Sequence, residues 1–313
     1  PAFFSGGRTM RNSPTVKAMQ YAGQTAQNFA DKTVVVTKLT DPRGLAYTHT
    51  LTLYADNPAA EIVTSVENIG SEARTLEMLS SFTLGSLSPF SEGLTPESLK
   101  IHRLRSTWSA EGRLVTEAAE DLQLEPSWKC YSANSVRFGS VGSFPVRGFV
   151  PFCAVEDTAH GVTWAAVTTQ SSSWQMELYR QDFGLSLSGG LADREFGAWC
   201  KTLAPGACFT APKAIVTAVR GGADTAAQVL AENARRAIEP LLPASEKTLP
   251  VLFNEFCSTW GKPTEETVLR HVRALKGKNL GYYVIDAGWY DDDAFEAATK
   301  LGRWELSRKA FPH

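Results

Sequence analysis

The sequence predicts a multidomain chain of the β + α/β class, in which an antiparallel β-sandwich precedes a parallel strand–helix–strand unit. Three observations lead to this fold class. Short runs of alternating apolar and polar residues fill most of the chain, a helical period replaces them after Gly222, and two apolar runs flank a second helical stretch near the end. At 313 residues the chain exceeds the usual size of one domain.

The region from Val34 to Pro212 has the pattern of many short strands. Leu51 and Leu53 alternate with polar neighbours, and the same alternation continues over residues 62–67. Turn-forming residues separate these runs, as at residues 56–58 and 68–70. Closely spaced strands of this kind are typical of an antiparallel sandwich.

A helix and a proline-rich stretch mark the predicted domain boundary. Asp224 is placed to cap the helix, and Pro240 stops it. The predicted apolar stripe of this helix is Ala227, Leu230, Ala231, Ala234 and Ile238. We therefore expect a sandwich domain over residues 1–222, a helical linker over 223–248 and a further domain over 249–313.

The last part of the chain predicts one strand–helix–strand unit. Residues 251–254 and 282–286 are the expected strands, and Thr264 is the expected N-cap of the helix between them. Gly277 fits the position just after the end of that helix. The predicted buried stripe of the helix is Val268, Val272 and Leu275.

The polar and aromatic residues at the ends of these two strands are the candidate sugar-binding site. Asp286 follows the second strand and Trp289 follows it closely, and a carboxylate beside an aromatic ring is a common way to hold a sugar. The first strand adds Asn254, Phe256 and Trp260. The alternatives are that Asp286 caps the next segment or pairs with a lysine, and that the aromatic rings only pack at the rim.

Composition and motifs argue against several other classes of protein. The net charge of −2 comes without a basic stripe, so no nucleic-acid partner is expected. No apolar stretch reaches the roughly 18 residues that span a bilayer, so no membrane partner is expected. Five cysteines without a CxxC pair indicate a reducing, cytoplasmic setting, although an export signal could precede Pro1. No cofactor is expected, since the glycine-rich stretch around Gly139 lacks the GK[ST] of a phosphate-binding loop.

Two further motifs have plain explanations, and a third stays open. Asp291, Asp292 and Asp293 lack the spacing of a calcium loop and predict a solvated helix start, so no metal site is expected. Cys257 is interpreted as a small apolar filler rather than as the nucleophile of a cysteine hydrolase. The stretch from Ile101 to Ser109 is either a solvated edge strand or a loop that reaches toward a polar ligand.

Several longer motifs resemble glycoside hydrolase family 36, the bacterial α-galactosidases and their relatives. The motifs are LPVLFNEFCSTWGKPTEE, LGYYVIDAGWYDDD and GRWELSRKAFP near the end of the chain, and VENIGSEARTLEMLSSFTLGSL and IHRLRSTWSAEG in the strand-rich region. The resemblance implies an N-terminal β-supersandwich, a helical linker and the start of a (β/α)₈ barrel with its active site at the carboxyl ends of the strands.

The resemblance also implies a retaining mechanism that uses two aspartates roughly 5 Å apart. In this family they lie on middle strands of the barrel, so both are expected beyond His313 and this chain alone is expected to be inactive. Asp286 matches the first of two adjacent aspartates that hold galactose hydroxyls, but Ala287 replaces the second and Phe256 replaces a tryptophan.

The resemblance therefore implies an α-galactoside or oligosaccharide substrate, with room at Ala287 for a modified sugar such as N-acetylgalactosamine, and a chain that can form a homo-oligomer. The alternative is a non-catalytic carbohydrate-binding β-sandwich.

Overall fold

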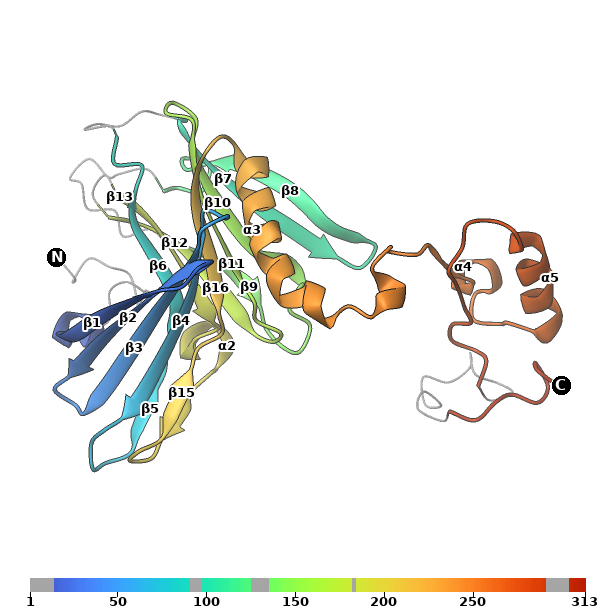
Figure 1. Cartoon of the computed structure of the whole chain (residues 1–313), viewed down its shortest axis with the longest axis horizontal. Coiled ribbons are helices and arrows are strands. Elements are labelled where there is room, and N and C mark those ends of the chain that lie inside the picture. Colours follow the sequence, from blue (N-terminus) through green and yellow to red (C-terminus); the bar gives the residue numbers. More distant parts are fainter. Residues whose placement is uncertain (1–13, 91–96, 125–134, 182–183, 291–303) are drawn as a thin grey trace. The chain divides into compact units, whose positions relative to one another are not determined.

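The computed structural model describes residues 14–90, 97–124, 135–181, 184–290 and 304–313 (Figure 1). The chain divides into two compact units, Pro1–Ala237 and Ile238–His313.

The first unit is built around two antiparallel sheets. The ten-stranded sheet has the order β1-β2-β3-β4-β16-β11-β10-β7-β8, and β15 also pairs with β4. Its strands are β1 Gln20–Asn28, β2 Lys32–Asp41, β3 Leu45–Tyr54, β4 Ala59–Asn68, β7 Leu99–Thr107, β8 Ala110–Ala118, β10 Gly148–Asp157, β11 Val162–Thr168, β15 Cys208–Thr210 and β16 Ala214–Arg220. The four-stranded sheet has the order β6-β13-β12-β9, with β6 Ser80–Leu87, β9 Ser135–Ser140, β12 Trp174–Gln181 and β13 Gly184–Leu191.

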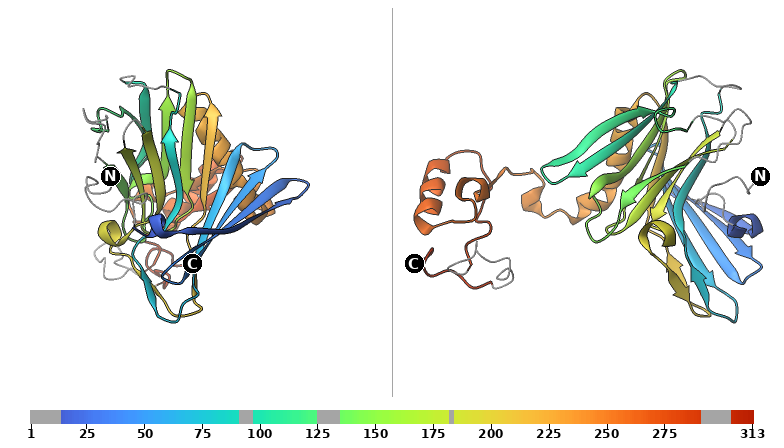
Figure 2. Two further views of the ribbon diagram at one scale, coloured as in Figure 1. Left: turned by 90° about the vertical axis from the view of Figure 1, so that its left-hand side faces the viewer. Right: turned by 180° about the vertical axis from the view of Figure 1, so that it is seen from behind.

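The main core lies between these two sheets, so the unit is a β-sandwich (Figures 1 and 2). Ile101 and Val155 of the large sheet and Trp174 and Leu187 of the small sheet are completely buried in it. They alternate along their strands with residues of the opposite face, which is the pattern that the sequence showed. The remaining elements of the unit are α1 Pro14–Ala18, β5 Arg74–Leu76, α2 Arg194–Gly197 and β14 Lys201–Leu203, which pairs with β5.

Helix α3 (Ala223–Ile238) packs on the outer face of the ten-stranded sheet (Figure 2). Ala226 and Leu230 are buried there against strand residues that include Phe152 and Ile215. The predicted stripe was wrong in part, because Ala227, Ala231 and Ile238 are exposed, whereas Ala226 is buried. Asp224 lies in the first turn and is not the N-cap. The helix thus belongs to the sandwich unit.

The segment from Ile101 to Ser109 is not an edge strand. Most of it forms β7, which pairs with β10 on one side and β8 on the other, and His102 and Arg103 are buried. The end of the segment is the turn between β7 and β8, where Trp108 is 88% exposed. The loop interpretation therefore fits only this turn.

The second unit contains two short 3₁₀ helices and one parallel strand–helix–strand arrangement. Its elements are η2 Glu239–Leu241, η3 Ala244–Glu246, β17 Leu252–Asn254, α4 Phe256–Thr259, α5 Glu265–Leu275 and β18 Tyr282–Val284. β17 and β18 pair in parallel, as the sequence predicted. The Thr264 hydroxyl caps α5 by accepting the Thr267 N–H, and Gly277 has the predicted left-handed backbone with φ +80°.

The predicted stripe of α5 is not buried, because the helix has no buried residue and Val272 is 44% exposed.

Candidate functional site

The parallel pairing of β17 and β18 brings the two candidate loops to the same edge of the sheet. Leu252 pairs with Tyr282 and Asn254 pairs with Val284, so both strands end at one level. Asn254 is the last residue of β17, and Asp286 lies two residues beyond β18. Carboxyl ends of parallel strands are where ligands bind in α/β folds, since the loops there converge.

Asn254 and Asp286 contact each other directly. The Asn254 Nδ2 donates to Asp286 Oδ2 at 2.6 Å, and the Asn254 Oδ1 accepts the Phe256 N–H at 2.9 Å. The Ala287 N–H donates to Asp286 Oδ1 at 2.6 Å. The Asn254 amide is the main cause that lowers the pKa of Asp286 below its ordinary value, and the Ala287 N–H adds to it. Asp286 is therefore ionised at neutral pH and can accept hydroxyl hydrogens.

A buried acid that the sequence analysis missed stands between these residues. Glu255 has no exposed surface, and its Oε1 accepts the Asp286 N–H at 3.1 Å. Its other oxygen accepts the Thr259 hydroxyl. The sequence shows a glutamate directly after an apolar strand, but it does not show that this side chain is buried.

The aromatic candidates lie in two separate groups, one of which also includes Tyr290 in contact with both Trp289 and Trp304. Phe256 and Trp260 lie edge to face with ring centroids 6.1 Å apart, and Trp260 is 67% exposed. Trp289 stacks on Trp304 at 6.1 Å with an interplanar angle of 21°. Across the described residues, no ring contact joins one group to the other.

The two groups nevertheless belong to loops that touch. Gly288 has φ +100°, and a Cβ built on it would lie 2.0 Å from the Gly261 carbonyl oxygen. Trp260 directly precedes Gly261 and Trp289 directly follows Gly288, so each ring flanks this contact. Only glycine permits both the backbone angle and the close approach at residue 288.

The structure describes only some of the other motifs that the sequence analysis considered. Cys257 is an exposed, free cysteine, and the described histidine nearest to it in sequence, His271, bonds to the Tyr283 hydroxyl instead. No group of three or more metal-ligating side chains occurs in the part of the chain that the structure describes. Asp291, Asp292 and Asp293 lie outside the described residues. No described helix is long and apolar enough to cross a membrane.

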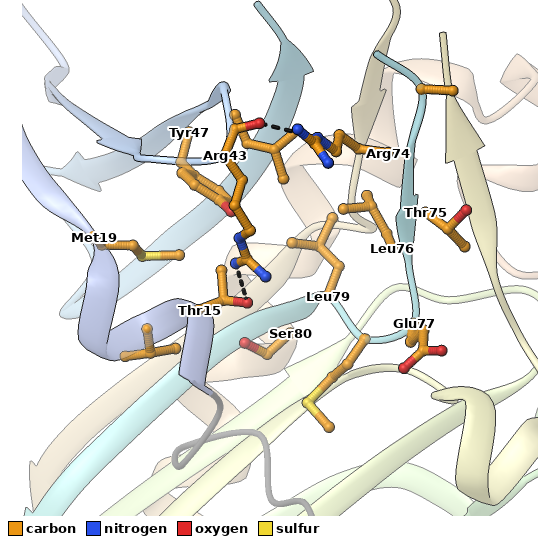
Figure 3. Close-up of a pocket in the computed structure, with 14 residues that line it drawn as sticks. Thr15, Met19, Arg43, Tyr47, Arg74, Thr75, Leu76, Glu77, Leu79 and Ser80 are labelled. Carbon is orange, nitrogen blue, oxygen red and sulfur yellow. Dashed lines mark hydrogen bonds between the residues drawn. The ribbon is translucent and has the colours of Figure 1, made fainter. Parts of the chain in front are cut away.

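A cavity of about 520 Å³ lies in the sandwich unit, lined by residues of α1, β3 and the segment 73–80 (Figure 3). None of the predicted site residues lines it. Arg43 extends into it and donates to Thr15, while Asp41 pairs with the same guanidinium at 3.0 Å. Burial raises the pKa of Asp41, but the bonds from Arg43 and Tyr47 outweigh it and leave the pKa lowered. The charge of Arg43 is thus already balanced by Asp41, and about half of the Arg43 side chain is exposed.

The chain was compared with known proteins. It is 23% identical over 309 residues to the α-galactosidase Mel36A of Lactobacillus acidophilus, a match that covers 96% of this chain and 38% of the relative. Its fold matches the family 36 α-galactosidase AgaA of Geobacillus stearothermophilus, crystallised as a variant with stachyose, with a TM-score of 0.75 and 16% identity.

The resemblance to glycoside hydrolase family 36 is confirmed. The α-galactosidase of Lactobacillus brevis is also similar, with a TM-score of 0.74 and 19% identity, over 94% of this chain and 39% of that one. AgaA is likewise matched over 94% of this chain and 40% of its own length. The chain thus spans about two fifths of the family 36 proteins that it matches. No model of a protein family matches the chain.

Proposed function

We propose that this chain is part of a retaining α-glycosidase that hydrolyses terminal α-galactoside-type residues. In this proposal the second unit is the first strand–helix–strand segment of a (β/α)₈ barrel. The observation that supports it is the Asn254–Asp286 pair at the shared carboxyl edge of two parallel strands. The similarity to α-galactosidases supplies the sugar class.

Asp286, Asn254, Trp289, Phe256 and Trp260 form one wall of the sugar pocket in this proposal. The carboxylate of Asp286 accepts hydroxyl hydrogens, Asn254 orients it, and the aromatic rings pack against the apolar faces of sugar rings. In this proposal the two catalytic aspartates lie on later strands of the barrel, outside these 313 residues.

Substrate choice follows from one departure already seen in the sequence, Ala287 in place of a second aspartate. Ala287 offers only its N–H where a second aspartate would offer a carboxylate, and this N–H is bonded to Asp286. A missing charge-assisted hydrogen bond costs about 1.5–3 kcal/mol of binding energy. The small side chain leaves room for a bulkier substituent, so we propose N-acetylgalactosaminides as the second substrate to try.

The test is turnover by the complete barrel enzyme that the proposal implies. We expect hydrolysis of p-nitrophenyl α-galactoside, of its N-acetylgalactosaminide, or of both, and we expect Asp286→Ala to lower kcat/KM at least about tenfold. Turnover of neither compound would remove the proposal.

The same variant tests the carbohydrate-binding alternative. If the β-sandwich is the sugar-binding part, galactose and raffinose still bind with unchanged affinity after Asp286→Ala. If the strand-end site binds the sugar, the affinity falls together with kcat/KM.

A further inference from the structure

Glu255 lies where the two strand-end loops of the second unit meet. It has no exposed surface, and its N–H donates to the Val284 carbonyl at 3.2 Å, which continues the parallel ladder by one residue. Its carbonyl accepts the Ser258 N–H at 2.8 Å and the Thr259 N–H at 3.2 Å at the start of α4. The backbone of Glu255 is therefore fixed to both strands and to the helix that follows.

The side chain of Glu255 extends this fixation to the loop after β18. One oxygen accepts the Asp286 N–H at 3.1 Å, and the other accepts the hydroxyl of Thr259. Among the described residues, Glu255 is the hydrogen-bond partner of the Asp286 N–H. These two donors replace the water molecules that the buried carboxylate loses on folding.

Asp286 is consequently held at three points. Glu255 holds its backbone, Asn254 holds Oδ2 and the Ala287 N–H holds Oδ1. The Asn254 and Ala287 bonds leave the carboxylate partly exposed, and the Glu255 bond fixes the backbone from which it projects. Loss of the Glu255 bond would leave the Asp286 N–H without this partner, because the Asn254 and Ala287 bonds hold only the carboxylate of Asp286.

We propose that Glu255 is a positioning residue, which fixes the backbone of Asp286 so that its carboxylate faces a pair of sugar hydroxyls. The inference rests on the proposed function, since it assigns a role in the same sugar site. Glu255 itself is buried and does not touch the sugar.

Two substitutions of Glu255 distinguish its hydrogen bond to the Asp286 N–H from the effects of its charge and of its volume. Glu255→Gln keeps an acceptor for the Asp286 N–H and places a donor beside the Thr259 oxygen. Glu255→Met fills a similar volume but accepts no hydrogen bond from either group. Glu266→Met on α5 is the matched control, because Glu266 is exposed in the same unit.

The experiment uses the complete barrel enzyme and galactose as the probe. Galactose affinity is measured by calorimetry, amide hydrogen exchange by mass spectrometry of peptides that span residue 286, and stability by thermal unfolding. We expect Glu255→Met to weaken galactose binding about tenfold and to speed exchange at residue 286. We expect Glu255→Gln to stay within about threefold of the unmodified protein, and Glu266→Met to change nothing.

Three results would overturn the inference. The first is unchanged affinity and exchange in Glu255→Met. The second is an equal loss in Glu255→Gln, which would show that the charge matters and the hydrogen bond does not. The third is a lowered unfolding temperature with unchanged affinity, which indicates a structural role only. If the unmodified enzyme binds no galactose, the proposed function fails, and the exchange at residue 286 alone still decides whether Glu255 fixes that backbone.

Discussion

Asp286 gains its low pKa from a single neighbour more than from any other group, and that neighbour can be removed. The Asn254 amide is the first cause of the lowered pKa. We expect Asn254→Ala to raise the pKa of Asp286 back toward its ordinary value of 3.8, as measured by carbon NMR titration of the 313-residue chain. Asp56, whose pKa is lowered mainly by Arg236, is the internal control and keeps its value.

The sign of the pH effect follows from the depressed pKa. The stabilising bond between Asn254 and Asp286 is fully present above pH 3.8 and is lost as the pH falls through the lower, folded-state pKa. Sugar binding is therefore expected to stay constant at neutral pH and to decline only in this acidic range. An unchanged Asp286 titration in Asn254→Ala would contradict the role given to the amide.

Asn233 on α3 is fully buried, and neither its Nδ2 nor its Oδ1 has a hydrogen-bond partner. We expect Asn233→Leu to stabilise the sandwich unit by about 1 kcal/mol, because the new side chain has nearly the same shape and loses no bond. A rise of about 2–4 °C in melting temperature would be the result. Gln228→Leu on the exposed side of the same helix is the control, and an equal rise there would point to helix propensity instead.

The residue types in the sequence indicated part of the candidate site, whereas the buried part became visible only in the structure. Asn254 and Asp286 were chosen as candidates because a polar residue after an apolar strand is visible in the sequence, and the structure brings their side chains together. Glu255 was missed because nothing in the sequence shows that this one carboxylate turns inward to reach the next loop. The pairing of Trp289 with Trp304 was also beyond prediction, since it depends on the path of the intervening chain.

Among the elements, the contact between the loops after β17 and β18 depends on glycine. We expect Gly288→Ala to destabilise the second unit by about 1–3 kcal/mol and to weaken galactose binding, because the new Cβ would overlap the Gly261 carbonyl. Gly277→Ala is a matched control. Gly277 has φ +80°, but no atom lies within 4 Å of a Cβ built on it, so this variant measures only the cost of placing alanine at a positive φ. Chemical denaturation measures the free energy of unfolding of both variants. An equal loss of stability in the two would mean that the contact between Gly288 and Gly261 is unimportant.

The sequence predicted the ends of a helix correctly where the local signals were strong. Thr264 and Gly277 mark the ends of α5 correctly, because capping and left-handed positions depend on a few adjacent residues. β1 was missed because its sequence, QYAGQTAQN, is polar and exposed along nearly its whole length. β7 was misjudged because its basic residues suggest solvent, while Arg103 is in fact buried against Phe138 and Phe149 and paired with Glu117.

At the scale of the whole molecule, the two units differ in how much they bury. Sandwich residues such as Trp174 and Leu187 have no exposed surface, whereas Leu252, Val272 and Ile285 of the second unit are exposed. We expect limited proteolysis of the 313-residue chain to digest the second unit quickly and to leave a resistant product that ends near residue 238. A protease-resistant second unit that unfolds cooperatively would contradict the proposal of an incomplete barrel.

The position of β16 in the ten-stranded sheet has a consequence for synthesis on the ribosome. β16 lies between β4 and β11 and pairs with both, so it joins the early ribbon of β1 to β4 to the later strands. The sheet cannot become continuous until residue 220 has left the exit tunnel. Until then the nascent chain carries two separate β-layers with open edges, at β4 and β11, that pair with any strand nearby. We therefore expect the nascent chain to be most prone to wrong strand pairing before this residue is made.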